Sequence, residues 1–286
     1  MLRLLHVCPQ QLPLKIKAVP SNLLAAMDRL TEAVSTTDGV TVSLDVYGHG
    51  ARNAVVIICP GFFQSKDTPT FQRMSQTLTG KYDILAMDFR GHGRSSGLYT
   101  FSAREGADFE AVLLWARERY QRIGVLGFSL GAAIAINTVS RHQDIVQSLV
   151  AVSAPCAFED IDFKFWTPEA IRTGMQGLES GAGCRPGSLL LKKERPIENV
   201  QKLKAIPVLF IHGTRDVIVG IQHSRRLYAA APGQKRLETI EGGSHAEALF
   251  RDDPKRFSDL VIGWYAQTLT HIPEASDRSP YKSDVR

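Results

Sequence analysis

The strongest constraint on the fold is the segment Gly127-Phe128-Ser129-Leu130-Gly131, because of what flanks it. Residues 123–126 before it (IGVL) are typical of a buried strand, and the small and apolar residues 132–137 after it (AAIAIN) favour a helix. In this context a Gly-x-Ser-x-Gly sequence predicts a sharp strand-to-helix turn that presents the serine hydroxyl above the edge of a sheet. We therefore take Ser129 as the candidate nucleophile. The alternative is that it only caps the helix.

Strand and helix patterns alternate along most of the remaining chain. Strands are expected at 54–59, 82–87, 123–127, 145–153, 207–212 and 237–240, and helices at 104–120, 130–141, 221–230 and 254–269. This alternation predicts an α/β fold with a mostly parallel sheet and helices on both faces. Residues 40–46 alternate apolar and polar side chains instead, which predicts a half-exposed antiparallel edge strand.

Three further segments flank or interrupt this pattern. Residues 1–37 are expected to be an N-terminal extension, and 38–270 the main domain. In the extension, Ser21 is expected to cap a helix that docks its apolar face on the core, although a dimer or membrane contact is an alternative. The apolar face consists of Leu23, Leu24, Met27, Leu30 and Val34. The alternation breaks at about 156–205, which we interpret as a cap insertion. The polar tail 271–286 is expected to be disordered.

Composition narrows the functional class. The net charge of +5 is spread along the chain, which argues against a nucleic-acid site. The four cysteines form no CxxC pair and have no metal-like spacing with histidine, so we expect free thiols. The chemistry argued below requires no metal and no cofactor. No apolar run is long enough to span a bilayer, and the first nine residues do not resemble a signal peptide. A cytoplasmic protein is therefore expected.

A serine nucleophile needs a base and an acid that orients the base. In hydrolases of this type the order is serine, acid, histidine, each after a later strand. Asp216 (in HGTRD) and His245 (in EGGSH) have this order and lie 245 − 216 = 29 residues apart. Taken alone, each could be an ordinary surface residue. Asp88 is the alternative acid, but it precedes Ser129, and we expect it to hold Arg90 or the local loop.

The reaction also needs two donors for an oxyanion. The backbone N–H of Leu130, directly after the serine, is one candidate. We expect the other to be the N–H of Phe62, in the Pro60-Gly61-Phe62-Phe63 loop after the first buried strand. A simple turn that closes the strand is the alternative interpretation of this loop.

Together these motifs resemble the α/β-hydrolase superfamily, in particular its esterase, lysophospholipase-like and serine-aminopeptidase-like members. The resemblance spans about residues 40–269 and consists of CPGFFQS, DFRGHGRSSG, GFSLG, HGTRD and GGSH in the family's order. Cys59-Pro60 replaces the family's usual histidine before the oxyanion loop. The resemblance implies an eight-stranded sheet and a small cap over the site. The residues expected to contact substrate are Phe63, Phe128, Phe165 and Trp166, although the cap aromatics could instead form the cap's own core.

The predicted reaction is acyl transfer to water from a small-molecule acyl substrate, an ester above all. The same three residues would also suit a thioesterase, an acyltransferase or a small-peptide peptidase, the last with Glu159 or Asp160 as a possible anchor for a free amine. A catalytically silent binding protein is the alternative outside enzymes. Serine at position 129 disfavours the chemistry of epoxide hydrolases and haloalkane dehalogenases, which use aspartate there. Oligomeric state is not predicted.

Overall fold

One sheet organises the chain. A computed structural model describes residues 29–48, 53–161, 179–188 and 190–269. Within these residues, eight strands are arranged in the order β1-β2-β4-β3-β5-β6-β7-β8. The pairings β1–β2 and β2–β4 are antiparallel and the others are parallel. The predicted mostly parallel, eight-stranded α/β architecture is confirmed.

The strands are β1 (Arg29–Ser35), β2 (Thr41–Tyr47), β3 (Ala54–Cys59), β4 (Asp83–Met87), β5 (Arg122–Phe128), β6 (Ser148–Val152), β7 (Val208–Gly213) and β8 (Lys235–Ile240). The helices are α2 (Pro69–Thr79), α3 (Glu105–Arg117), α4 (Leu130–Val139), α6 (Pro196–Asn199), the 3-10 helix η1 (Val200–Lys202), α7 (Gln222–Ala230), α8 (Ala248–Asp252) and α9 (Pro254–Thr268). None of these helices combines the length and apolar character needed to cross a membrane.

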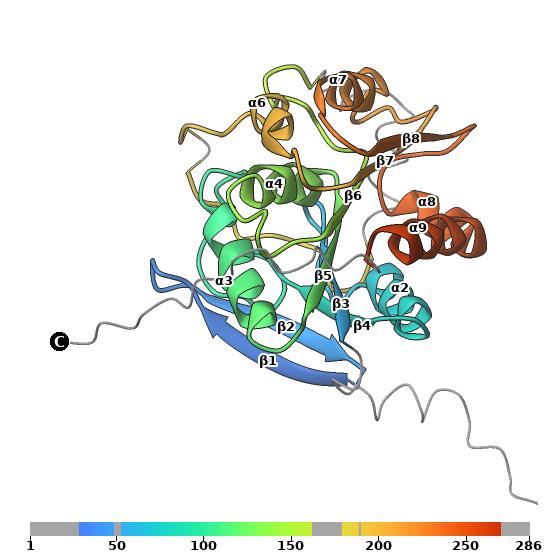
Figure 1. The fold of residues 1–286 in the computed structure, drawn as a ribbon. Helices are drawn as coiled ribbons and strands as arrows, with labels where there is room; N and C mark the ends of the chain where they lie inside the picture. Colours follow the sequence, from blue (N-terminus) through green and yellow to red (C-terminus); the bar gives the residue numbers. More distant parts are fainter. Residues whose placement is uncertain (1–28, 49–52, 162–178, 189, 270–286) are drawn as a thin grey trace, which may run out of the picture.

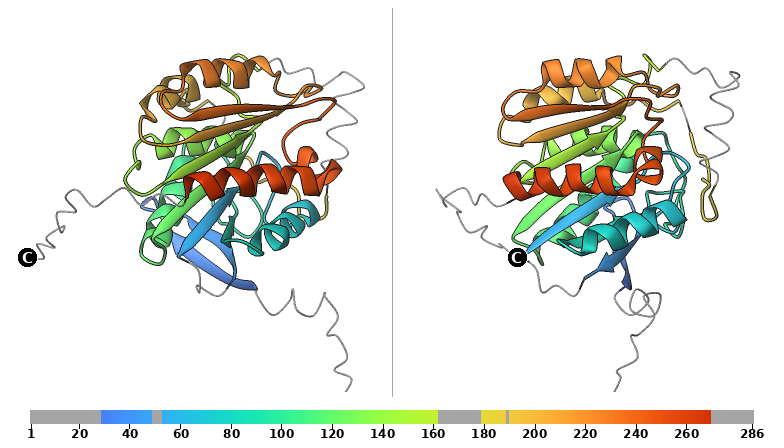
Figure 2. Two further views of the ribbon diagram at one scale, coloured as in Figure 1. Left: turned by 45° about the vertical axis from the view of Figure 1, so that its right-hand side comes forward. Right: turned by 90° about the vertical axis from the view of Figure 1, so that its right-hand side faces the viewer.

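Helices cover both faces of the sheet (Figures 1 and 2). On one face α3, α4 and α7 pack over a core that includes Val55 and Ile57 of β3. On the other face α2, α8 and α9 pack over a second core that includes Val56 and Ile58. Successive side chains of a strand point to opposite faces, so a strand between two cores must be apolar throughout. This explains the continuous apolar run of β3.

The helix expected to begin at Ser21 is not found where the structure can test it. Residues 29–35 form β1, which pairs with β2 from Arg29↔Tyr47 to Ser35↔Thr41. Leu30 and Val34 therefore lie on a strand. Residues 21–28, with the rest of the expected helix, lie outside the described residues. The helical spacing was misleading because pairing with β2 overrides local propensity at a sheet edge.

The prediction of a half-exposed edge strand at 40–46 is also wrong. β2 is antiparallel, but it lies between β1 and β4, and its side chains from Val42 to Tyr47 are buried. Its polar members are accommodated because they have partners. The Ser43 N–H donates to Ser95 Oγ at 2.8 Å, and Asp45 forms an ion pair with Arg29 at 2.6 Å. Alternation here reflects buried polar contacts rather than exposure to water.

A buried lysine links three strand-connected segments. The Lys66 side chain is fully buried, and its Nζ lies 3.5 Å from the carboxylates of both Asp45 and Asp88. Asp88 also accepts hydrogen bonds from the N–H groups of Lys66 and Arg94. Asp88 therefore holds the local loop as expected, whereas Arg90 pairs with Asp108 and Asp38 instead. Opposite charges that are buried together avoid the cost of a lone buried charge.

Helix α4 approaches β3 so closely that a side chain is excluded at Gly131. A Cβ built there would overlap the carbonyl oxygens of Cys59 and Pro60. These are backbone atoms, which cannot move aside as the end of a flexible side chain can. By contrast, a Cβ at Gly263, within α9, would meet nothing within 4 Å.

We expect Gly131→Ala to lower the free energy of unfolding by about 1–3 kcal/mol, because overpacking forces the backbone to shift. The matched variant Gly263→Ala should be neutral or stabilising by up to about 1 kcal/mol, since alanine favours helix over glycine. Urea unfolding followed by circular dichroism measures both. Equal free energies of unfolding for the two variants would contradict the close approach of α4 to β3 at Gly131.

Candidate active site

Ser129 occupies the sharp turn between β5 and α4. Its φ is 48° and its ψ is −116°, a backbone conformation that is unfavourable for a residue with a side chain and costs about 1–3 kcal/mol. The turn is held by backbone hydrogen bonds, including one from the Ser129 N–H to the Val152 carbonyl at 2.8 Å. The serine is only partly buried, so its hydroxyl is available at the edge of the sheet.

The structure brings the three predicted residues together. His245 Nε2 lies 2.9 Å from Ser129 Oγ, and His245 Nδ1 lies 2.7 Å from Asp216 Oδ2. Asp216 follows β7 and His245 follows β8, so both are delivered to the same edge of the sheet as Ser129. An ionised carboxylate can only accept, so Nδ1 carries the proton and Nε2 is left to accept from the serine hydroxyl.

Asp216 is held in its ionised form. Burial alone would raise its pKa, but the positive charge of His245 and hydrogen bonds from His212 and His245 outweigh burial and bring the pKa below its ordinary value. Oδ1 also accepts from the N–H groups of Ile218 and Val219 at 3.0 and 2.9 Å. His212 Nε2 also lies 3.2 Å from Asp216 Oδ2, a contact that sequence analysis missed.

Asp216 shifts His245 in the opposite direction. Burial would lower the pKa of the imidazole, but the charge and hydrogen bond of Asp216, with a smaller contribution from Glu247, raise it above 6.5. The ring can therefore accept a proton from Ser129 more readily than an isolated histidine at the same depth. This arrangement can activate a hydroxyl for attack on a carbonyl carbon.

The expected oxyanion donors lie beside the serine. A Cβ built on Gly61 would lie 3.4 Å from the Cβ of Ser129, so the loop after β3 packs directly against the turn. Among the described residues, no acceptor is hydrogen-bonded to the N–H of Phe62 or of Leu130. Leu130 is the first residue of α4, where a backbone donor has no partner within the helix. Both N–H groups are therefore available to a ligand.

Aromatic side chains surround this loop. Phe62 is 42% exposed and Phe63 is 37% exposed. The Phe62 ring stacks on Tyr99 with centroids 5.3 Å apart, and it meets Phe101 edge-on at 5.7 Å. Phe101 in turn contacts Phe158 at 5.9 Å. Partly exposed rings next to a nucleophile suit an apolar or aromatic part of a substrate.

Of the other three residues predicted to contact substrate, one is in the core and two are not described. Phe128 is fully buried and packs against Phe71 and Phe257 in the core under α2 and α9, so it does not line a substrate pocket. Its position in the motif was misleading because successive residues of β5 point to opposite faces. Phe165 and Trp166 lie outside the described residues.

The acidic residues considered as amine anchors already have partners. Glu159 pairs with Arg195 at 2.6 Å, and Asp160 pairs with Arg226 at 2.5 Å. A different acid, Glu247, lies two residues after His245 and accepts a hydrogen bond from Gln64 at 2.9 Å. This contact joins the histidine loop to the oxyanion loop. Sequence analysis missed it because the two residues are 183 positions apart.

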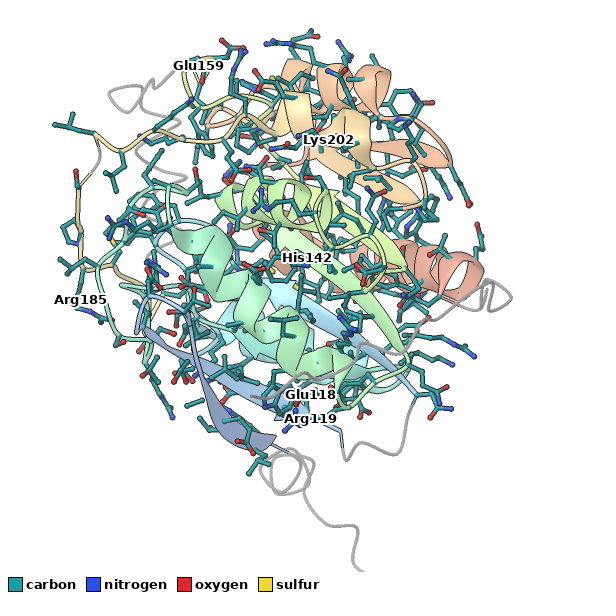
Figure 3. All side chains as sticks on the ribbon, turned by 60° about the vertical axis from the view of Figure 1, so that its left-hand side comes forward. Glu118, Arg119, His142, Glu159, Arg185 and Lys202 are labelled. Atoms are coloured by element: carbon teal, nitrogen blue, oxygen red, sulfur yellow. The ribbon has the colours of Figure 1, made fainter. Side chains whose placement is uncertain are left out.

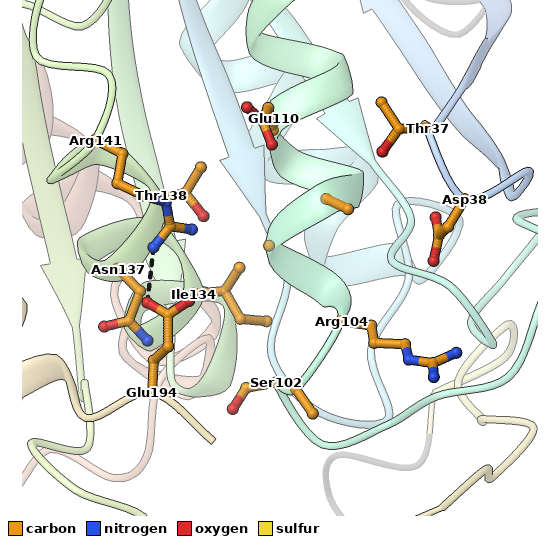
Figure 4. A pocket seen from close by; sticks show the side chains of 13 residues that line it. Thr37, Asp38, Ser102, Arg104, Glu110, Ile134, Asn137, Thr138, Arg141 and Glu194 are labelled. Atoms are coloured by element: carbon orange, nitrogen blue, oxygen red, sulfur yellow. Dashed lines mark hydrogen bonds and ion pairs between the residues drawn. The ribbon is translucent and has the colours of Figure 1, made fainter. Parts of the chain in front are cut away.

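A separate cavity of about 440 Å³ lies between α3 and α4 (Figure 4), and Ser129 is not among its lining residues. Four of its charged lining residues, Arg141, Glu194, Glu110 and Asp38, already contact a group of opposite charge or a histidine. Arg141 binds Glu194 at 2.7 Å, Glu110 contacts His142 at 3.0 Å, and Asp38 binds Arg90 at 2.7 Å. None of the three predicted catalytic residues lines it, so we do not assign this cavity to the reaction.

The described residues contain no group of three or more His, Cys, Asp or Glu side chains placed to hold a metal ion. Three of the four cysteines lie in the described part of the chain, and all three are free: Cys59, Cys156 and Cys184.

Comparisons with known proteins agree with the fold. Residues 54–173 match the family model described as alpha/beta hydrolase fold. A solved esterase of Pyrococcus furiosus covers 90% of this chain and 99% of its own, with 21% identity and a TM-score of 0.68. A solved esterase from Rhodococcus covers 83% of this chain and 99% of its own, with 23% identity and a TM-score of 0.68.

Curated relatives are also similar in sequence, and their names state no activity. An uncharacterised protein of Mycobacterium tuberculosis is 23% identical over 245 residues, which cover 68% of this chain and 71% of that protein. The uncharacterised protein YfhR of Salmonella typhimurium is 28% identical over 196 residues, covering 66% of this chain and 63% of that protein. The two solved esterases, at 21% and 23% identity, establish the fold of this chain.

We expect Asp216→Asn to lower the pKa of His245, because it removes the negative charge that raises that pKa while leaving the imidazole buried. A pH titration of the His245 ring by NMR measures this directly. The matched variant Asp144→Asn changes a carboxylate that is 71% exposed, and it should leave the titration unchanged. A midpoint in Asp216→Asn equal to or above that of the unmodified protein would contradict the electrostatic account.

Proposed function

We propose that this chain, which belongs to the α/β-hydrolase superfamily, is a serine hydrolase that cleaves carboxylic esters of small or medium-sized molecules. The observation that supports this most directly is the hydrogen-bonded path from Ser129 through His245 to Asp216, with contacts of 2.9 and 2.7 Å. The nucleophile, its base and the acid that orients the base are thus within reach of one another.

In the first step, Ser129 Oγ attacks the ester carbonyl carbon while His245 Nε2 takes the hydroxyl proton. The carbonyl oxygen becomes an oxyanion, which accepts hydrogen bonds from the N–H groups of Phe62 and Leu130. Asp216 stabilises the imidazolium. The C–O bond to the leaving group then breaks, the Nε2 proton passes to the departing alkoxide, and an acyl-serine remains.

In the second step, a water molecule attacks the acyl carbon while His245 Nε2 takes one of its protons. The same N–H groups hold the second oxyanion. When the bond to Ser129 Oγ breaks, the proton returns from the imidazole to the serine, and the carboxylic acid leaves. The cycle needs only groups of this chain and water.

Two observations favour an ester over other acyl compounds. Several solved structures with this fold are named esterases. In addition, Glu159 and Asp160 are paired with arginine, which weakens the case for recognition of a free amine by a peptidase. A thioesterase or acyltransferase would use the same three residues, and a silent binding protein would keep the geometry without turnover.

We expect Ser129→Ala to lower kcat for a short-chain aryl ester by about 10³-fold or more, because it removes the hydroxyl that contacts His245 Nε2 and would carry the acyl group. A chromogenic ester assay gives the rate, and labelling with a fluorophosphonate followed by peptide mapping identifies the reactive serine. The control is Ser140→Ala, which removes a hydroxyl that caps the Asn137 carbonyl at the end of α4 and should leave turnover unchanged. Unchanged turnover in Ser129→Ala would rule out this mechanism.

We further expect an oxoester to be cleaved faster than its matched thioester and faster than the corresponding amide. A panel that keeps one acyl group and varies only the leaving atom measures this preference as kcat/KM. Added alcohol as a second acceptor tests for acyl transfer. Preference for the thioester or for transfer to the alcohol would move the assignment to those classes, and no labelling of Ser129 would favour the silent protein.

A further inference from the structure

His92 lies behind the oxyanion loop and does not take part in the path described above. It is 2% exposed and sits in the Arg90-Gly91-His92-Gly93 segment after β4. Its Nδ1 lies 3.1 Å from the Arg90 carbonyl oxygen, and its Nε2 lies 3.3 Å from the backbone nitrogen of Phe63. The ring also packs edge-on against Tyr99 with centroids 4.6 Å apart.

The protonation of His92 follows from these two contacts. A carbonyl oxygen can only accept, so the proton lies on Nδ1. Burial lowers the pKa of His92 to about 4, opposed by the hydrogen bond to Arg90 and aided by the charge of Arg185, so the ring is neutral near pH 7. Nε2 therefore carries a lone pair and accepts from the Phe63 N–H.

Both backbone polar groups of Phe63 are hydrogen-bonded. Its N–H donates to His92, and its carbonyl accepts from the N–H of Gly183 at 2.8 Å. Its φ of 68° lies in the left-handed region, which is unfavourable for a phenylalanine and persists only where surrounding contacts impose it. The Phe63 N–H lies in the peptide that joins Phe62 to Phe63, and the Phe62 N–H lies in the adjacent peptide that joins Gly61 to Phe62. Fixing the first peptide limits how the second can turn, so the direction of the Phe62 N–H depends on how Phe63 is held.

We propose that His92 is a positioning residue for the hydrolytic reaction: by accepting from the Phe63 N–H, it fixes the Gly61–Phe63 turn so that the Phe62 N–H points at the oxyanion. This inference rests on the proposed function, since it assigns a purpose to a contact of the same site. Loss of the acceptor leaves Ser129, His245 and Asp216 in place and disturbs only one oxyanion donor.

Residues 183–185, in the segment predicted to be a cap insertion, support the same loop. Gly183 binds Phe63, and the Arg185 N–H donates to the Gly91 carbonyl at 2.7 Å, next to His92. His92 and Cys184 form a bridge of the antiparallel type. The turn after β3 is therefore held between the loop after β4 and the arm formed by residues 183–185.

Two substitutions separate the two hydrogen bonds of His92. In His92→Asn the amide can still donate to the Arg90 carbonyl, but it is too short to reach Phe63. In His92→Gln the longer side chain can place its oxygen where Nε2 now lies. We expect His92→Asn to lower kcat by about 10- to 100-fold with KM nearly unchanged, as for a misplaced oxyanion donor. His92→Gln should recover most of that loss.

Binding of a transition-state analogue is a measurement that would not change if His92 served only to pack against its neighbours. A trifluoromethyl ketone forms an oxyanion with Ser129, so its inhibition constant should rise in His92→Asn by the same factor by which kcat/KM falls. The control is His142→Asn. His142 lies on the α3–α4 side, well apart from Arg185 (Figure 3), and both kinetic constants should be unchanged.

Several outcomes would overturn the inference. Unchanged kcat in His92→Asn, equal losses in the Asn and Gln variants, or an unchanged inhibition constant would show that the ring serves only packing. Thermal unfolding identifies a variant that does not fold; His92→Phe, which keeps a ring and lacks the acceptor, then replaces His92→Asn under the same criteria. If the unmodified protein neither cleaves esters nor labels at Ser129, the proposed function fails first, independently of His92.

Discussion

The rest of the structure depends on the sharp backbone turn at Ser129. The turn is possible because the residues that flank it, Gly127 and Gly131, have no side chain and let the backbone pack directly against neighbouring backbone. A Cβ at Gly127 would lie 2.6 Å from the Cα of Ala132, and one at Gly131 would overlap the end of β3. Close packing of α4 on β3 also brings the loop after β3 next to the serine. One steric requirement thus places both Ser129, the proposed nucleophile, and the loop that carries the proposed second oxyanion donor.

Parallel strands then bring the other two groups to the same place. β6 separates β5 from β7, and β8 follows β7, so the loops that carry Asp216 and His245 emerge at the same edge as the turn. Proximity alone would not orient the imidazole. Asp216 does so because its carboxylate is itself fixed, by two backbone N–H groups on one oxygen and by His212 and His245 on the other. Burial strengthens these contacts by excluding water.

The sequence predicted what depends on local pattern and chain order. The continuous apolar runs, the Gly-x-Ser-x-Gly turn and the order of Ser129, Asp216 and His245 are readable without knowing which segments meet. The failures share one cause, which is long-range contact. A helix is expected over part of β1 because its pairing with β2 is not visible in the sequence. The polar side chains of β2 are expected to be exposed because Arg29 and Lys66, the partners of Asp45, lie elsewhere in the chain. Phe128 was read as pocket-lining although its face of β5 turns inward.

The motif residues carry the chemistry of the proposed reaction and do not select the substrate. The path from Ser129 to Asp216 would suit any acyl group, so we expect selectivity to arise from the side chains that surround Ser129, including those of the loop after β3. Those described are Phe62, Phe63 and Phe101, and they are supported by the loop after β4 and by the arm at 183–185 rather than by the sheet. Changes in these segments can therefore alter substrate preference without moving Ser129, His245 or Asp216. Because the arm also holds Phe63, such changes should affect kcat together with KM, since the substrate wall and the oxyanion donor share one backbone.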